Sequence, residues 1–186
     1  MQLFLPKLFW RSIPVTVSDR MESRRAVSGW TMWAGLIVFL AVCFAVAGLG
    51  SLSTNPSIDN WYAALAKPSW NPPNWAFGPV WTILYMMMAV AAWLVWRRKA
   101  SVAGAGVPLA LFAVQLLLNA LWSYLFFGLH RPDLAFVEIV LLWAAIFATL
   151  LAFRRAVPLA GWLLLPYLLW VTFAAILNFT IWRLNQ

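Results

Sequence analysis

Apolar residues fill five long blocks of the chain, and polar residues are confined almost entirely to the segments between them. A helix needs roughly 20 apolar residues to cross the hydrocarbon core of a bilayer. Four of the blocks contain no Asp, Glu, Lys or Arg, and the other contains only Glu138. The pattern predicts an all-α membrane protein, a bundle of five transmembrane helices whose connections are short except for the first, 51–74. The predicted spans are residues 30–50, 75–96, 107–127, 134–153 and 157–182.

The composition agrees with the pattern. Of the 186 residues, 65% are hydrophobic and only 10% are charged, whereas a soluble domain carries about 25% charged residues. The net charge of +8 comes from bases at the ends of the apolar blocks, so it indicates membrane orientation and no nucleic-acid partner. The single cysteine, Cys43, excludes an internal disulfide and a multi-cysteine metal site.

The Lys and Arg residues predict the orientation, because they are more numerous on the cytoplasmic side of a membrane. Ten lie on the side of the amino terminus and three on the other side. We therefore expect a multi-pass cell-membrane protein with a cytoplasmic amino terminus, and with the carboxyl terminus and the first loop on the opposite side. The ten are Lys7, Arg11, Arg20, Arg24, Arg25, Arg97, Arg98, Lys99, Arg154 and Arg155, and the three are Lys67, Arg131 and Arg183.

The first 28 residues differ from the rest. Pro6, Lys7 and Arg11 interrupt their apolar run, which makes it too short for a signal sequence. Met21 is an alternative start, so residues 1–20 are either a tail or an artefact of start-site assignment. We expect a disordered tail over 1–28 and a five-helix domain over 29–186.

Several polar and aromatic residues repeat at helical spacing inside the predicted spans, and polar groups at this depth tend to face the bundle interior. The third span has one such stripe, the fifth has another, and the second has an aromatic one. Small Ala174 in the fifth-span stripe leaves room for a flat molecule. The stripes are Gln115, Asn119 and Trp122; Trp170, Ala174 and Asn178; and Phe77, Trp81, Tyr85 and Met88.

Simpler interpretations cover part of this set. Gln115 is expected to hydrogen-bond a neighbouring helix, and tryptophans at span ends form interfacial belts, but this does not explain Trp170 in mid-span. We expect Glu138 to reach the interface, His130 to be solvated in a short loop, and Cys43 to be a small apolar packing residue.

The spans contain no Lys for a retinal Schiff base and no His to bind a haem. The chain also has no Ser-His-Asp set, no paired carboxylates and no glycine-rich phosphate loop. An interior of aromatic rings and a few amides suits a large, flat, mostly apolar ligand.

Three long motifs point to a known family. The segment "WYAALAKPSWNPPNWAFGPVWTILY" (61–85) resembles the signature of the TspO/MBR family, the tryptophan-rich sensory or translocator proteins, also called peripheral-type benzodiazepine receptors. "QLLLNALWSYLFFGLHRP" and "PYLLWVTFAAILNFTIWRLN" match the family in order and spacing. The resemblance covers about residues 30–185.

The resemblance implies a five-helix protein, commonly a homodimer, that binds protoporphyrin IX or a related tetrapyrrole in a cavity near the first loop, with no required cofactor and no metal. The implied ligand site comprises eight residues, in which Trp81 and Asn119 would offer N–H donors. The rigid prolines Pro68, Pro72 and Pro73 would make the first loop a lid. The eight residues are Tyr62, Pro72, Trp81, Tyr85, Asn119, Trp122, Trp170 and Ala174.

Trp61 and Trp170 match tryptophans linked in some bacterial members to light- and oxygen-dependent porphyrin breakdown. Phe179 stands where the sterol-recognition pattern has Tyr, so no sterol partner is expected. Three hypotheses follow: a tetrapyrrole-binding sensor, regulator or transporter; a porphyrin-degrading enzyme; and a small-solute transporter without a tetrapyrrole role.

Overall fold

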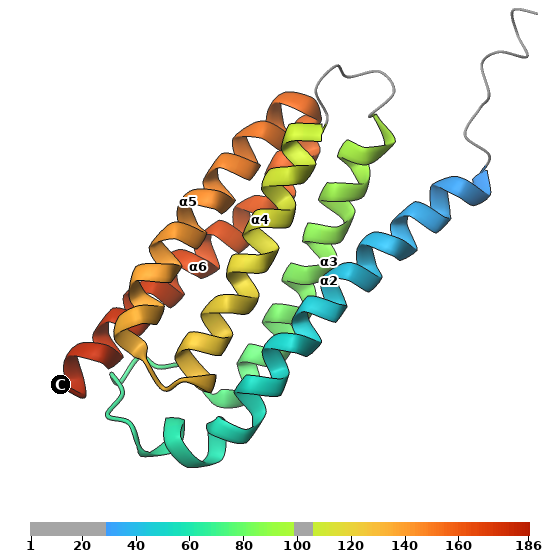
Figure 1. Ribbon diagram of the computed structural model, residues 1–186. Coiled ribbons are helices and arrows are strands. Elements are labelled where there is room, and N and C mark those ends of the chain that lie inside the picture. The colour runs from blue at the N-terminus through green and yellow to red at the C-terminus, as the bar shows by residue number, and fades with distance from the viewer. Residues whose placement is uncertain (1–28, 99–105) are drawn as a thin grey trace, which may run out of the picture.

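The structure is a computed structural model that describes residues 29–98 and 106–186, and within them it is a helical bundle without strands (Figure 1). Five helical segments of the described chain are long and apolar enough to span a membrane. The predicted all-α five-helix bundle is confirmed, while the prediction for residues 1–28 lies outside the described residues. The elements are α2 (Gly29–Ser57), η1 (Ile58–Tyr62), α3 (Asn74–Arg97), α4 (Gly106–Ser123), η2 (Tyr124–Gly128), α5 (Pro132–Ala156) and α6 (Pro158–Leu184).

The ends of the helices follow from local chemistry. Pro132 and Pro158 begin α5 and α6, where a missing N–H costs nothing and the fixed φ suits a helix. Asp133 lies in the first turn of α5 and accepts hydrogen bonds from Arg131 at 2.6 and 2.8 Å, which raise the pKa of the Arg131 guanidinium above its ordinary value. Arg154 and Arg155 occupy the last turn of α5, where the helix dipole favours cations.

The first span is longer than predicted. The polar stretch after Gly50 is helical and continues through the π-helical turn η1 to Tyr62, although we had assigned residues 51–74 to a loop. Ser51 and Thr54 donate their hydroxyl hydrogens to the carbonyls four residues earlier, each at 2.9 Å. Side chains that would favour a loop in water are therefore satisfied inside the helix, and the true loop is 63–73.

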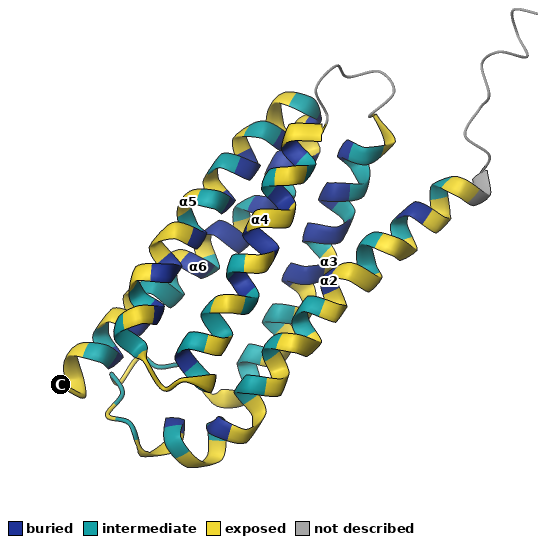
Figure 2. Ribbon diagram, in the orientation of Figure 1, coloured by how far each residue is buried: buried dark blue, intermediate teal, exposed yellow. Residues whose placement is uncertain are grey.

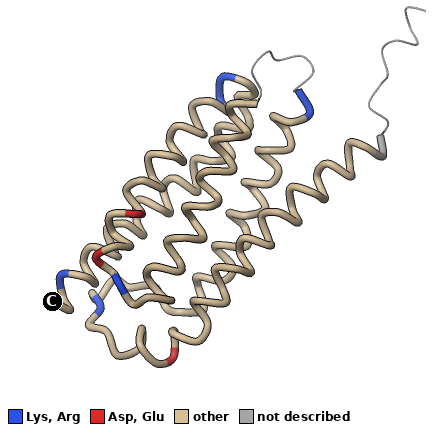
Figure 3. The backbone as a smooth tube through the Cα atoms, in the orientation of Figure 1, with Lys and Arg blue, Asp and Glu red and all other residues tan. Residues whose placement is uncertain are grey.

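The helices run alternately up and down, so three features meet at one end of the bundle, which we call the loop end (Figure 1). It carries the loop 63–73, the α4–α5 turn and the carboxyl terminus. The described Lys and Arg residues lie at the two ends of the bundle and not between them (Figure 3).

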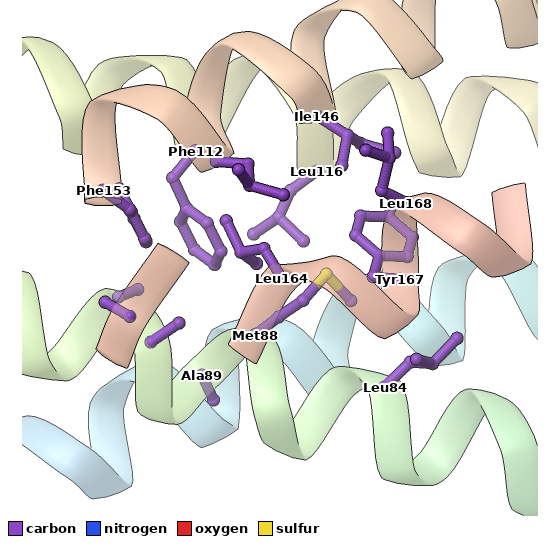
Figure 4. Close-up of a cluster of buried hydrophobic side chains, with 14 of the residues drawn as sticks. Leu84, Met88, Ala89, Phe112, Leu116, Ile146, Phe153, Leu164, Tyr167 and Leu168 are labelled. Carbon is purple, nitrogen blue, oxygen red and sulfur yellow. The ribbon is translucent and has the colours of Figure 1, made fainter. Parts of the chain in front are cut away.

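The tightly packed core lies in the half of the bundle away from the loop end. Met88, Phe112, Phe153 and Leu164 are almost completely buried there (Figure 4). Gly161 lets α6 approach α5 closely, because a Cβ at this position would lie 2.8 Å from the Arg154 Cα. The outward faces of the helices are exposed and apolar (Figure 2), as expected for surfaces in contact with lipid.

Candidate functional site

The other half of the bundle, toward the loop end, contains a cavity of about 490 Å³. This volume is in the range of pockets for small molecules and cofactors. Its walls come from α2, η1, α3, α4, η2 and α6. The lining residues are Phe44, Ala47, Gly50, Ser51, Thr54, Asn55, Ile58, Tyr62, Asn74, Trp75, Phe77, Gly78, Trp81, Thr82, Tyr85, Asn119, Trp122, Ser123, Phe126, Phe127, Trp170, Phe173, Ala174, Leu177, Asn178 and Ile181.

Most of the site residues implied by the family resemblance lie around this one cavity. Seven of the eight line it, and Pro72 does not. The stripes explain the arrangement, because residues four apart on one helix face the same side. Farther along the stripe of α3, Met88 is fully buried in the core. The seven are Tyr62, Trp81, Tyr85, Asn119, Trp122, Trp170 and Ala174.

Aromatic rings form the walls at several angles. Trp170 meets Phe77 edge to face, with ring centroids 6.0 Å apart, and lies 5.4 Å from Phe173 in a tilted arrangement. Trp81 packs against Tyr85 with a centroid distance of 5.6 Å. Such pairs hold large rings in fixed orientations, so the cavity presents flat aromatic surfaces.

Asn119 links three helices through a buried hydrogen-bond network. The Tyr85 hydroxyl donates to the Asn119 Oδ1, and the Asn119 Nδ2 donates to the Tyr167 hydroxyl at 3.1 Å. Asn119 is only 2% exposed and Tyr167 is fully buried. An amide nitrogen carries two donors, and one of them is used in this network. The Asn119 side chain therefore has a structural role that the sequence did not reveal, while its role toward a ligand stays a prediction.

A second network supports the indole of Trp122. Its Nε1 donates to the Asn178 Oδ1 at 3.0 Å, and the Asn178 Nδ2 donates to the Pro132 carbonyl at 2.8 Å. By contrast, the indole N–H groups of Trp75, Trp81 and Trp170, which also line the cavity, have no acceptor among the described residues. The donor role that the resemblance implies for Trp81 stays a prediction.

No residue that lines the cavity in the described chain carries a formal charge. The polar lining groups are hydroxyls and amides, several of them on α2. Sequence reasoning missed this wall, although Phe44, Ala47, Ser51, Thr54 and Ile58 follow one helical stripe. The polar members lie beyond Gly50, where the sequence predicts a loop, so the apolar pattern alone does not show that the stripe continues.

The first loop is held in place by side chains at both of its ends. The Tyr62 hydroxyl donates to the Asn71 Oδ1 at 2.9 Å. The Asn185 amide pairs with Ala66 in both directions, each bond 2.9 Å long, and Lys67 donates to three carbonyls of the preceding turn. None of residues 63–73 lines the cavity, so closure of the cavity by this loop stays a prediction.

Trp61 does not line the cavity but packs behind its wall. Its ring stacks on the imidazole of His130 with a centroid distance of 4.4 Å, and it meets Phe126 edge to face. His130 is exposed, as predicted, but its Nε2 also lies 3.2 Å from the Ser57 Oγ. Of the two tryptophans that the resemblance links to porphyrin breakdown, Trp61 and Trp170, only Trp170 lines the cavity.

Three further polar or thiol residues were assigned from the sequence. Cys43 is fully buried, as predicted for a packing residue. Gln115 makes a weak contact, with its Nε2 3.9 Å from the Met88 sulfur. The prediction for Glu138 is wrong: the side chain is only 5% exposed, and neither carboxylate oxygen has a hydrogen-bond partner within residues 29–98 and 106–186. Because α5 turns this position inward beside Ala135 and Ile139, the carboxylate does not reach the interface.

These features define a class of protein, namely a five-helix membrane bundle with an aromatic cavity at one end. Residues 39–183 match the TspO/MBR family, and this chain belongs to that family. The predicted family is thereby confirmed.

Relatives from bacteria and animals match most of the chain. The tryptophan-rich protein TspO of Chlorobaculum tepidum is 47% identical over 154 residues, which cover 81% of this chain and 95% of the relative. The tryptophan-rich sensory protein of Cereibacter sphaeroides is 44% identical, covering 82% and 92%. The translocator protein of Homo sapiens is 44% identical over 127 residues, covering 68% and 75%.

Proposed function

We propose that this membrane protein binds a tetrapyrrole such as protoporphyrin IX in the cavity at the loop end, and acts as a sensor, regulator or transporter of it. The observation that carries the proposal is the cavity of about 490 Å³ with aromatic walls. A large, flat, apolar macrocycle gains most from stacking on such rings and from leaving water.

The neutral polar groups give the ligand an orientation. The Trp81 indole N–H and the remaining Asn119 N–H would donate to ligand acceptors inside the cavity. Because no cationic side chain lines the walls, ionised ligand carboxylates would lie at the opening, where water solvates them, since a buried unpaired charge is costly.

A second candidate is light- and oxygen-dependent degradation of the bound porphyrin. It is favoured by the position of Trp170, which lines the cavity, so that a macrocycle bound there would be able to stack on its indole. An indole is an oxidisable donor, so an excited porphyrin stacked on it would be able to take its electron. Trp61 has no such contact with the cavity.

The test is a titration of metal-free protoporphyrin IX into the full-length protein in lipid nanodiscs, followed by indole quenching and porphyrin absorbance. We expect Trp170→Phe to keep most of the affinity and to lose most of any light-driven degradation. Trp170→Ala should lose both. Trp162→Phe is the matched control, because Trp162 is 56% exposed on the same helix and outside the cavity.

If the wild-type protein did not bind protoporphyrin, the proposal of tetrapyrrole binding would be wrong. If it bound protoporphyrin but gave no new bilin-like absorbance on illumination, only the proposal of porphyrin degradation would be wrong. If Trp170→Phe degraded porphyrin at the wild-type rate, the Trp170 indole would be only a packing surface.

We also propose the orientation that the charges predict, with the loop end on the non-cytoplasmic side, and a homodimer. Ala41 and Ala45 are both exposed on the outside of α2, where small residues four apart allow two helices to approach closely. A reporter active only outside the cytoplasm, fused to each terminus, tests the orientation. Mass measurement in mild detergent tests the dimer, and monomer at all concentrations would contradict it.

A further inference from the structure

The exposed residues of the cavity wall all lie on two neighbouring helices. The lining residues on α4, η2 and α6 are buried or half-buried, whereas seven lining residues on α2 and α3 are exposed. The cavity is therefore closed on one side and open between α2 and α3. The seven are Phe44, Ser51, Asn55, Asn74, Trp75, Gly78 and Thr82.

The two helices are held together at the other end of the bundle. A Cβ at Gly35 would lie 2.4 Å from the ring of Trp96, and the Trp93 Nε1 donates to the Met32 carbonyl at 2.9 Å. Among the described residues, no hydrogen bond joins α2 from Phe44 onward to α3. At the level of the cavity the two helices touch through the rings of Phe44 and Tyr85, whose centroids are 6.4 Å apart, so their separation there would break an apolar contact and none of these hydrogen bonds.

The opening lies along the membrane-spanning part of both helices. Thr82 is eight residues into α3, about 12 Å along the axis at 1.5 Å per residue. Leu49 and Leu52 on α2 and Ile83 on α3 are 53–73% exposed, which places apolar outer surfaces beside the opening. Such surfaces face lipid in a membrane protein.

We propose that the gap between α2 and α3 is a lateral portal through which a flat, apolar ligand enters the cavity directly from the bilayer. The proposal rests on the function proposed above. A tetrapyrrole partitions into membranes, and this route lets it reach the aromatic walls without crossing the clamped loop 63–73. Ser51, Asn55 and Thr82 would solvate its polar edge during passage.

Two glycines provide a matched pair of variants. A Cβ added at either Gly78 or Gly106 meets no atom within 4 Å, so both helices tolerate a side chain there. Gly78 is exposed and lines the cavity, which places it in the portal, whereas Gly106 is exposed at the start of α4 and outside the cavity lining. Gly78→Leu narrows the portal, and Gly106→Leu adds the same bulk away from it.

The first experiment measures protoporphyrin IX association and dissociation rates in nanodiscs by stopped-flow quenching. We expect Gly78→Leu to slow both association and dissociation by about tenfold, because a portal affects passage in both directions. Gly106→Leu should match the wild type. Unchanged rates for Gly78→Leu, or a change in Kd carried by the dissociation rate alone, would overturn the portal.

A second experiment needs no porphyrin. In the Cys43→Ala background, Ser123→Cys places one thiol on the cavity wall, since Ser123 lines the cavity. We expect a bilayer-soluble pyrene maleimide to react faster than a water-soluble charged maleimide, and Gly78→Leu to slow only the former. Faster reaction with the water-soluble reagent would contradict lateral entry and indicate entry at the loop end. Protection from both reagents would contradict it too, and would indicate a second copy over the gap.

The two experiments separate the hypotheses. If the wild type does not bind protoporphyrin, the proposed function fails while the maleimide result still decides the portal. If protoporphyrin binds but the bilayer-soluble reagent has no advantage, the portal fails and the proposed function stands.

Discussion

Replacement of Asn119 by Leu tests whether the polar group on the cavity wall first serves the fold or the ligand. Leu has a similar volume but neither donor nor acceptor. The change leaves the hydroxyls of Tyr85 and Tyr167 without the hydrogen bonds that they make to Asn119, and both tyrosines are buried. We therefore expect the fold to lose stability even without a ligand.

The magnitude follows from the two lost partners. A buried polar group without a hydrogen bond costs about 1–3 kcal/mol, so Asn119→Leu, which strands two hydroxyls, should lower the free energy of unfolding by roughly 2–6 kcal/mol. Adding Tyr85→Phe and Tyr167→Phe removes the stranded hydroxyls as well. The triple variant should recover most of the loss, because an apolar replacement of all partners is nearly neutral.

The assay is reversible unfolding in mixed micelles, followed by helix content. Gln115→Leu is the matched control, since Gln115 is a buried amide one turn earlier on α4 with one weak sulfur contact. It should be neutral or slightly stabilising. An Asn119→Leu variant as stable as the wild type, or a triple variant no more stable than the single one, would refute the reasoning. Protoporphyrin affinity, measured on the folded fraction, reports the separate loss of the ligand donor.

Two further predictions concern the loop and the buried acid. Pro72→Gly with Pro73→Gly should weaken porphyrin binding about tenfold, roughly 1.4 kcal/mol, with unchanged helix content, because the ligand must then order the loop; unchanged affinity would show that the loop is only a connector. Glu138→Gln should keep or raise the thermal midpoint at pH 7, by about 2–4 °C for each kcal/mol gained, because neither oxygen of the buried carboxylate has a hydrogen-bond partner in the part of the chain that the structure describes. A drop of several degrees in a thermal scan would reveal a stabilising contact to this carboxylate.

Much of the fold could be predicted from the sequence, because each span is a continuous apolar block between basic or proline-containing segments. The end of the first helix could not, since Ser51 and Thr54 favour loops in water but are satisfied within a helix by the carbonyls four residues earlier. For the same reason, the part of the cavity wall that α2 forms with Ser51 and Thr54 could not be predicted.

The candidate site, too, could be predicted only in part. The i, i+4 spacing places Trp81 with Tyr85 and Trp170 with Ala174 on single helix faces, so those pairs were predictable. Contacts between helices depend on crossing angles that one sequence does not contain. The bond between Asn119 and Tyr167 was therefore missed, and so was the inward position of Glu138.

The central claim is that the aromatic cavity is the tetrapyrrole site, and its most direct test is to fill the cavity. Ala174 is half-buried and lines it, so Ala174→Trp places an indole where the macrocycle would lie. Ala144→Trp adds the same group on the exposed side of α5. We predict that protoporphyrin titration of folded Ala174→Trp in nanodiscs shows at least about a tenfold loss of affinity, with Ala144→Trp unchanged. Wild-type affinity in Ala174→Trp would contradict the account and place the tetrapyrrole elsewhere.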